Sequence, residues 1–456
     1  MNILALDLGT SSVRGLVLDG AAVPLPGALA RRRVTIAVGA DGAATLDGPG
    51  YLGALVECLD ELNAGGHLDG VELVATAAQW HSILPLDVGG VPLGPVLTWL
   101  DTRPVPAGDA RGPVDEAAFH ARTGTWWHRF YWTVRVPWLR GRTGAPPARF
   151  AGLAEYVLGQ LLDEAPMSVS EASGTGLLDL RTLEWDPEAL ELAGLRAAEL
   201  PRLAPLGWQG RLRSQFRRRW PGLADARWAA PTGDGAASNI GSGCVDPSRA
   251  AITVGTSAAV RLVQRAPVGT ELPPLPAGLW RYRVDQEHTV TGTAYSAGGN
   301  LFAWARRELR LPSGPALDAE LAKLTPGNVP AADPRLGGDR PPGMAPAGSG
   351  SISGIGFSTT AVQIVAGLMN ALCQQVARDL VEIESIVEHP VAVVLGGGAV
   401  EASEWWREAF VAALAPREVS HMTNPEIGAT GAALVAIGRF AEAAGLESIS
   451  RTADQD

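Results

Sequence analysis

Cysteine is scarce in this chain: its 456 residues include only Cys58, Cys244 and Cys373, and none of them belongs to a CxxC pair. A sparse and odd set of this kind excludes a disulfide framework and a cysteine-based metal cluster, and it is typical of reduced thiols in a cytosol. Long apolar runs are also missing, since no stretch approaches the roughly 20 residues that a membrane-spanning helix needs. No basic segment with a cleavage site opens the chain, so we expect no signal peptide, no membrane partner and a cytoplasmic location.

Lysine is almost absent as well, and arginine takes its place. The formal net charge is −11, which argues against a nucleic-acid partner. We interpret the main basic run, RLRSQFRRR at 211–219, as a solvated surface segment. With 46% apolar and 19% charged residues, the composition is that of a globular protein. The length exceeds what one core supports and predicts two or three domains.

Two stretches, far apart in the chain, share one arrangement. Residues 3–19 (ILALDLGTSSVRGLVLD) and 250–263 (AAITVGTSAAVRLV) each consist of an apolar strand, a Gly-Thr-Ser turn and a second apolar strand. Glycine lacks a Cβ, so a ligand oxygen can approach the main-chain N–H groups of such a turn, and the hydroxyl groups add donors. One such hairpin is ordinary, whereas two predict a duplicated fold that uses both turns to hold a ligand.

The chain divides into two halves of similar size. A stretch rich in Pro, Gly and small residues, RWAAPTGDGAASNIGSGC, separates them, and we predict domains at 1–242 and 243–442 followed by a polar tail at 443–456. The elements that we expect are strand hairpins at 2–19 and 250–263, strand–turn–strand at 71–87, helical segments between about 115 and 165, helices at 298–310 and 359–387, a loop at 325–350, and a strand at 391–400 followed by a helix.

Two aspartates and a third glycine turn point to chemistry. Asp7 lies just before the first Gly-Thr-Ser turn, and an acidic residue beside a phosphate-binding turn suits a Mg²⁺–nucleotide site. Gly396–Gly398 lies between a strand and a helix, where a flat or anionic ligand can approach a positive helix end. Asp234 lies in TGDGAASN at the predicted boundary. A loop position is the common reason for such an aspartate, but a carboxylate between glycines can also reach a substrate hydroxyl as a general base.

Taken in order, these motifs resemble the FGGY carbohydrate kinases of the actin-like ATPase superfamily, from about residue 2 to residue 440. The resemblance implies an α/β fold with two ribonuclease-H-like domains that flank an ATP/sugar cleft. It implies ATP and Mg²⁺ as cofactors and a small-molecule sugar or sugar acid as partner, and it leaves a homodimer open. The matching segments are LDLGTSS, WLDTR, GDGAASNIGSG, VGTSAAV, YSAGGN, LGGDRPPG, LGGGAVEASEWWREAF and NPEIGATGAALVA.

The resemblance also assigns roles to residues. Asp234 matches the catalytic base, and Asp7 matches the aspartate that organises the metal and the phosphates. The positions implied for ATP are Gly9, Thr10, Ser11, Gly255, Thr256, Gly299, Asn300, Gly397, Gly398 and Ala399. The positions implied for the acceptor, besides Asp234, are Trp80, His81, Asp101, His128 and Tyr131.

Two segments resemble the gluconate-kinase branch of the family: TGTWWHRFYWTVRVPWL at 123–139 and SGTGLLDLRTLEWD at 173–186. We therefore expect phosphorylation of D-gluconate to 6-phosphogluconate, with Arg129 and Arg135 placed to oppose the carboxylate. The chain departs from the family where Arg135 replaces a frequent lysine and where GSGS at 348–351 replaces Ala-Arg-Gly.

Other functions stay open at this point. A xylulokinase-like ketose kinase would share the fold. An actin-like or chaperone-like ATPase would need no acceptor pocket, and the motifs at 79–103 and 232–243 count against it. A sugar-sensing repressor would need an added DNA-reading helix-turn-helix, whereas the sequence begins with the first strand. A binding module without catalysis is disfavoured because Asp7 and Asp234 are both present.

Overall fold

A computed structural model describes residues 1–105, 112–340, 343, 348–422, 424 and 426–439. The predicted polar tail at 443–456 and parts of the predicted loop at 325–350 lie outside these residues. Within the described part of the chain, no helix is both long and apolar enough to cross a membrane.

The first domain is built on a mixed sheet with the strand order β10-β11-β6-β1-β2-β3, and β12 also pairs with β6. The predicted hairpin is confirmed, because β1 pairs antiparallel with β2, while β6 runs parallel to β1. The strands are β1 (Asn2–Leu8), β2 (Ser12–Leu18), β3 (Pro24–Arg33), β6 (Val71–Ala78), β10 (Gln209–Gly210), β11 (Arg227–Ala229) and β12 (Thr232–Gly233).

The second domain repeats this topology with the strand order β15-β16-β14-β13-β19-β20. Here β13 pairs antiparallel with β14 and parallel with β19, as β1 does with β2 and β6. The duplication that the two Gly-Thr-Ser turns predicted is therefore present, and both domains are ribonuclease-H-like. The strands are β13 (Arg249–Val254), β14 (Ala258–Arg265), β15 (Trp280–Arg283), β16 (His288–Tyr295), β19 (Ala392–Gly396) and β20 (Val419–His421).

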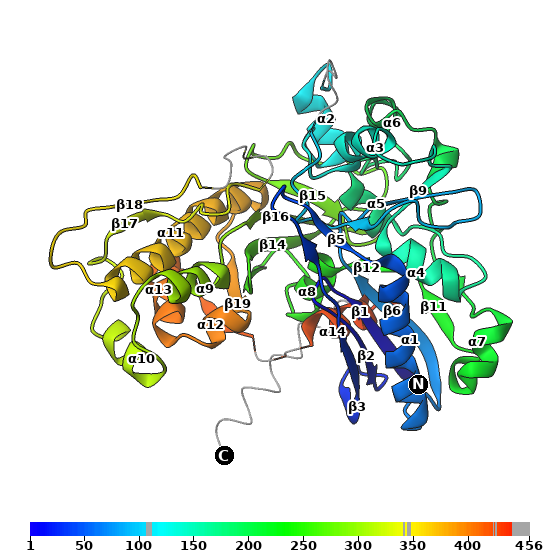
Figure 1. Cartoon of the computed structure of the whole chain (residues 1–456), viewed down its shortest axis with the longest axis horizontal. Coiled ribbons are helices and arrows are strands. Elements are labelled where there is room, and N and C mark those ends of the chain that lie inside the picture. Colours follow the sequence, from blue (N-terminus) through cyan, green and yellow to red (C-terminus); the bar gives the residue numbers. More distant parts are fainter. Residues whose placement is uncertain (106–111, 341–342, 344–347, 423, 425, 440–456) are drawn as a thin grey trace.

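Helices cover the two sheets and build the lobes seen in Figure 1. The predicted helices at 298–310 and 359–387 correspond to α9 and α11, and a capping box of Thr360 and Gln363 fixes the start of α11. The helices are α1 (Gly48–Ala64), α2 (Glu116–Thr123), α3 (Trp132–Arg140), α4 (Leu153–Leu161), α5 (Val169–Thr175), α6 (Pro187–Ala193), α7 (Ser214–Arg219), α8 (Asp234–Gly241), α9 (Gly299–Glu308), α10 (Pro315–Leu321), α11 (Ala361–Val387), α12 (Gly398–Glu401), α13 (Glu404–Leu414) and α14 (Ile427–Ala436).

Short strands complete the structure. They form a three-stranded sheet in the order β4-β5-β8 and two pairs, β7 with β9 and β17 with β18. Their bounds are β4 (Ala37–Val38), β5 (Ala44–Leu46), β7 (Leu84–Leu86), β8 (Val96–Leu97), β9 (Arg149–Ala151), β17 (Ala331–Asp333) and β18 (Ser351–Ser353).

Both faces of the first sheet are buried. Leu4 and Leu6 of β1 point to the core under α1, whereas Ile3 and Ala5 point to the opposite face, as the two-residue period of a strand requires. That opposite face packs against α8 and α14. In Figure 1 α14 lies beside α8 between the lobes, so the end of the described chain returns to the first domain.

Candidate active site

The strand ends bring the predicted site residues together. Gly9 follows β1, Trp80 and His81 follow β6, and Asp234 follows β12; these three strands run parallel, with β6 in the middle. The carboxyl ends of parallel strands meet at one edge of a sheet, which is where α/β proteins bind ligands. Residues that are 225 positions apart in the sequence thereby border the same space.

The two Gly-Thr-Ser turns face one another across this space. A cavity of about 300 Å³ is lined by Thr10 from the first turn, by Gly255 and Thr256 from the second, and by Asp234. An adjoining cavity of about 390 Å³ is lined by Thr10 and Thr256 again, together with His128 and Asp101. Both domains therefore contribute donors to one hollow beside a carboxylate.

Asp234 is the first residue of α8, and not a loop residue. Its Oδ1 accepts a hydrogen bond of 2.7 Å from the main-chain N–H of Gly235. Burial raises the pKa of Asp234, and the charge of Arg261 and main-chain N–H groups of Gly235 and Trp80 lower it in part. A carboxyl group suits proton transfer near neutral pH when burial raises its pKa while nearby positive charge and N–H donors still stabilise its anion.

The glycines beside Asp234 make room for other site residues. A Cβ on Gly235 would lie 2.5 Å from Cζ3 of Trp80 and 2.9 Å from Nε of Arg261. A Cβ on Gly174, in α5, would lie 2.6 Å from Cδ1 of the same tryptophan. The small residues that the sequence places around Asp234 therefore let one indole ring and one guanidinium group approach the carboxylate.

Asp7 belongs to a small charged cluster. Nη1 of Arg14 lies 3.8 Å from Oδ2 of Asp7 and 2.9 Å from Oε2 of Glu426, which belongs to the segment before α14. Burial raises the pKa of Asp7 to about 6, opposed by the charge of Arg14 and reinforced by Asp234 and Glu426.

Carboxylate oxygens that repel one another suit a hard divalent cation, so the donors at Asp7 fit Mg²⁺ in kind. Among the described residues, however, no three His, Cys, Asp or Glu side chains converge as a metal cage. A cation here would need further ligands from nucleotide phosphates and water.

The second Gly-Thr-Ser turn is fastened to the start of α9. The main-chain N–H groups of Gly299 and Asn300, at the start of α9, donate to the carbonyls of Gly255 and Thr256 at 2.7 and 3.1 Å. The amide of Asn300 is occupied within its own loop, where it donates to the carbonyl of Ser296 and accepts from Gly298. Gly299 and Asn300 thus hold the second turn in place.

The third turn lies against this assembly. Gly397 has φ of 105°, a backbone conformation that favours glycine, and Gly398 has open space where a Cβ would be. The Cβ of Ala399 lies 3.2 Å from the position that a Cβ of Gly299 would take. The helix that follows, α12, has only four residues, so it provides little of the positive helix end that the sequence predicted at this turn.

The acceptor-side residues are fixed by specific hydrogen bonds. Nε1 of Trp80 donates to the carbonyl of Ser170 at 3.0 Å, and the hydroxyls of Tyr131 and Tyr282 lie 2.8 Å apart. Nδ1 of His81 donates to the carbonyl of Gly174 at 2.6 Å, which leaves Nε2 as an acceptor. Burial lowers the pKa of His81 well below its usual value, so the ring is neutral.

Two conformational features mark this region. His81 has φ of 66°, a left-handed backbone conformation that is uncommon outside glycine and clusters at functional sites. His128 accepts at Nδ1 from the N–H of Phe130 at 3.2 Å, so its Nε2 carries the hydrogen. That buried Nε2–H has no hydrogen-bond partner among the described residues. One histidine therefore offers an acceptor and the other a donor, a pair that suits hydroxyl groups.

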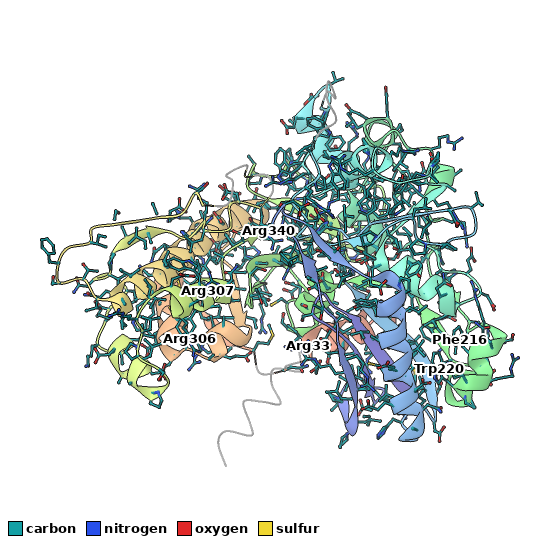
Figure 2. The ribbon with its side chains drawn as sticks, in the orientation of Figure 1. Arg33, Phe216, Trp220, Arg306, Arg307 and Arg340 are labelled. Carbon is teal, nitrogen blue, oxygen red and sulfur yellow. The ribbon has the colours of Figure 1, made fainter. Side chains whose placement is uncertain are left out.

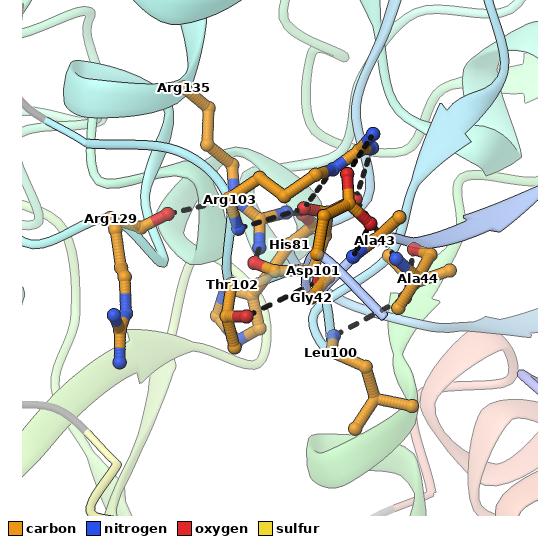
Figure 3. Close-up of polar contacts among 12 residues, drawn as sticks. Gly42, Ala43, Ala44, His81, Leu100, Asp101, Thr102, Arg103, Arg129 and Arg135 are labelled. Carbon is orange, nitrogen blue, oxygen red and sulfur yellow. Dashed lines mark hydrogen bonds and ion pairs between the residues drawn. The ribbon is translucent and has the colours of Figure 1, made fainter. Parts of the chain in front are cut away.

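Asp101 and Arg135 are held by hydrogen bonds to neighbouring segments of the protein (Figure 3). The carboxylate of Asp101 accepts from the N–H of Ala44 and from the guanidinium of Arg103, at 2.6 Å for the shortest contact. Arg135 is fully buried and donates to the carbonyls of His81 and Arg129, at 2.7 and 3.0 Å. Asp101 lines the second cavity, whereas Arg135, predicted to oppose a carboxylate, lines neither cavity and directs its guanidinium at main-chain carbonyls. Arg129 lines the second cavity.

Several lining residues were not foreseen from the sequence. Trp280 and Tyr282 of β15 belong to the second domain but stack on each other at 4.4 Å and contact Trp80, with Tyr282 5.0 Å from its ring. Arg261 of β14 lines the first cavity, and Arg340 lines both cavities where the two domains meet (Figure 2). An arginine within a strand and an arginine within a Gly/Pro-rich loop give no local signal of such a position.

Comparison with known proteins agrees with this geometry. Residues 2–223 match the N-terminal domain of the FGGY family of carbohydrate kinases, and residues 250–438 match its C-terminal domain. The chain belongs to the FGGY family. It is a carbohydrate kinase of the FGGY type, and ATP is the phosphoryl donor of this family.

Individual FGGY relatives are named for different acceptors. The gluconokinase of Bacillus subtilis (strain 168) is 25% identical over 74% of this chain and 68% of the relative. The xylulose kinase of Streptomyces rubiginosus is 29% identical over 97% and 88%. Two solved structures share the fold: gluconate kinase from Lactobacillus acidophilus, with a TM-score of 0.82 and 21% identity over 96% and 89% of the two chains, and Plasmodium falciparum glycerol kinase with ADP, with a TM-score of 0.80 and 17% identity over 96% and 89%.

Proposed function

We propose that this FGGY kinase transfers the γ-phosphoryl group of ATP to a sugar acid, with D-gluconate as acceptor and 6-phosphogluconate as product. The observation that carries this proposal is the charge of the first cavity. Its lining includes two guanidinium groups, Arg261 and Arg340, and one carboxylate, Asp234, while the adjacent His81 is neutral. Beside the phosphates of ATP, an anionic acceptor would pair with a guanidinium group here, and a neutral one would not.

Asp234 is the proposed general base. It takes the proton of the terminal hydroxyl while the oxygen of that hydroxyl forms a bond to the γ-phosphorus. The bond between the γ-phosphorus and the oxygen that bridges it to the β-phosphate breaks, and ADP leaves with both electrons of that bond. The neutral histidines, His81 as acceptor and His128 as donor, orient the other hydroxyl groups of the substrate.

The two Gly-Thr-Ser turns are the proposed phosphate clamps. The hydroxyls of Thr10 and Thr256 and the main-chain N–H groups beside Gly9 and Gly255 face the phosphates, while Ser11 borders the second cavity. Gly397, Gly398 and Ala399, which lie against Gly299, form the wall for the adenosine. Mg²⁺ neutralises phosphate charge when it is bound, and Asp7 is the residue of this chain proposed to orient it. The boundary between the two domains remains proposed at 242/243.

A ketose such as xylulose is the second candidate acceptor. It is favoured by the 29% identity with a xylulose kinase over nearly the whole chain. A measurement of ADP release with D-gluconate, D-xylulose, L-ribulose and glycerol, each across its own saturation range, separates the two proposals. We expect kcat/KM to be highest for D-gluconate. A neutral acceptor that exceeds it tenfold would overturn the sugar-acid proposal and leave the kinase activity intact.

A further inference from the structure

Two enclosed arginines near the site, Arg261 and Arg281, each have an N–H donor without a partner among the described residues, but of these two only Arg261 lines a cavity. Arg135 and Arg283 are fully buried and donate to main-chain carbonyls, and Arg281 donates to the hydroxyl of Thr291 and the carbonyl of Pro273. The Nε atom of Arg261 is inaccessible to solvent and has no hydrogen-bond partner among the described residues. A guanidinium group has five N–H donors, and leaving them unmatched in an enclosed place is costly. The group is therefore suited to a ligand.

The surrounding backbone keeps Arg261 in position. It lies on β14, at the centre of the second sheet, and its partner on β16 is Gly292, which has no side chain. A Cβ on Gly292 would lie 3.2 Å from Cγ of Arg261, and a Cβ on Gly235 would lie 2.9 Å from its Nε. Two glycines on two different elements thus leave space for this one side chain, which a strand holds more firmly than a loop would.

The guanidinium shares the first cavity with the proposed base. Arg261, Asp234 and Tyr282 all line it, and Asp234 is the carboxylate whose charge acts on Arg261. Arg340 lines the cavity as well, but the ring of Trp99 covers the face of its guanidinium at 3.9 Å. Two guanidinium groups thus accompany one carboxylate in this cavity, and Arg261 is the one that is held on a strand and has a buried N–H donor without a partner among the described residues.

We propose that Arg261 is a specificity-determining residue that binds the carboxylate of the acceptor through charge-assisted hydrogen bonds while the terminal hydroxyl lies at Asp234. This inference rests on the proposed function, and it names the residue that recognises the carboxylate of the acceptor. A substrate with CH₂OH in place of the carboxylate leaves the guanidinium unpaired, and sites that lose such a partner reject the analogue strongly.

D-gluconate and D-glucitol make the test, because they differ only in that group. For Arg261→Met, which keeps length and removes the charge, we expect kcat/KM for D-gluconate to fall at least about hundredfold. The value for D-glucitol should stay within about threefold, so that the preference for the acid collapses. Arg261→Lys should recover part of the loss with D-gluconate, since it restores the charge without the bidentate geometry.

Arg129→Met is the matched control, because Arg129 lines the second cavity and was the arginine that the sequence suggested. It should leave the ratio of the two acceptors unchanged. Equal losses of kcat/KM for both acceptors in Arg261→Met would mean that Arg261 acts only through Asp234. A collapsed preference for the acid in Arg129→Met would assign the carboxylate to Arg129. Either result would overturn this inference and leave the proposed function intact. A wild-type enzyme that prefers D-glucitol would overturn the proposed function together with it.

Discussion

The guanidinium of Arg340 lies 3.9 Å from the centroid of the Trp99 ring, and the two residues belong to opposite domains. Arg340 comes from the segment between β17 and β18, and Trp99 follows β8. Arg340 also lies 5.8 Å from the ring of Phe130, a second aromatic residue of the first domain. This contact closes one side of the cavity that contains Asp234, and it connects the two domains directly.

Loss of that contact should favour an open arrangement. A desolvated cation–π contact contributes about 2 kcal/mol, which is roughly thirtyfold in the ratio of closed to open molecules. Small-angle scattering with D-gluconate and a non-hydrolysable ATP analogue should show a smaller radius of gyration than the free protein. Arg340→Leu should weaken this contraction, while Arg306→Leu, on the exposed face of α9, should not. An Arg340→Leu protein that contracts as the wild type does, with both ligands bound, would contradict the role of the contact.

Asp7→Asn tests the proposed metal position. The amide keeps the shape of Asp7 but removes the charge that attracts Mg²⁺, so we expect a lower kcat and a higher requirement for Mg²⁺. The KM for D-gluconate should stay near its wild-type value, because the acceptor is bound by other residues. Steady-state kinetics at varied Mg²⁺ measures both effects. A raised acceptor KM with unchanged kcat would argue against this assignment.

Two buried carboxyl groups, on α4 and α5, make the free energy of unfolding depend on pH. Burial raises the pKa of Glu155 to about 7, and burial together with the charge of Glu155 raises the pKa of Glu171 well above its usual value. Because the folded state favours the protonated form, Glu155 contributes stability fully below its unfolded pKa of about 4.5, and this is lost as the pH rises through about 7.

Glu155→Gln should therefore stabilise the protein at pH 8, on the order of 2 kcal/mol, and change little at pH 4.5. Thermal unfolding at both pH values measures the difference. The control is Glu408→Gln on the exposed side of α13, for which we expect the same small change at both pH values. Equal stability of wild type and Glu155→Gln at pH 8 would contradict the raised pKa.

Gly235→Ala should reduce activity by crowding the site. Its Cβ would lie 2.5 Å from Trp80 and 2.9 Å from Arg261, so one of these side chains must shift. We expect kcat/KM for D-gluconate to fall by tenfold or more, since small displacements of site residues are costly. Gly53→Ala, in α1, meets no atom within 4 Å and should raise stability by up to about 1 kcal/mol with unchanged activity. If Gly235→Ala has the same kcat/KM for D-gluconate as the wild type, the close packing at this glycine does not affect activity.

Local patterns were enough to predict much of the fold. The hairpins, α9 and α11 follow from strand alternation, glycine turns and helical periodicity, all of which act over a few neighbouring residues. Short motifs mark Gly9, Gly255, Trp80 and Asp234, and the family resemblance predicted the first two to bind ATP and the last two to bind the acceptor. Their meeting point follows once β1, β6 and β12 are known to run parallel.

The remaining features of the site depend on packing between residues that are far apart in the sequence. The sequence suggested Arg135 as a ligand of the acceptor, but its guanidinium holds the carbonyls of His81 and Arg129, a contact that no spacing reveals. Arg261 and Arg340 border the cavity only because the second domain lies against the first. The same holds for Tyr282, which crosses to the acceptor side, and for α14, which packs back on the first sheet.

The most direct test of the account is the turnover of Asp234→Asn beside its affinity for both substrates. Asparagine keeps the shape of the side chain and cannot accept the proton, and loss of a general base costs about 10²–10⁴ in rate. We predict that ADP release with D-gluconate falls within that range, while calorimetry gives nucleotide and D-gluconate affinities close to those of the wild type. A rate within threefold of the wild type would contradict the assignment of Asp234 as the base of this kinase.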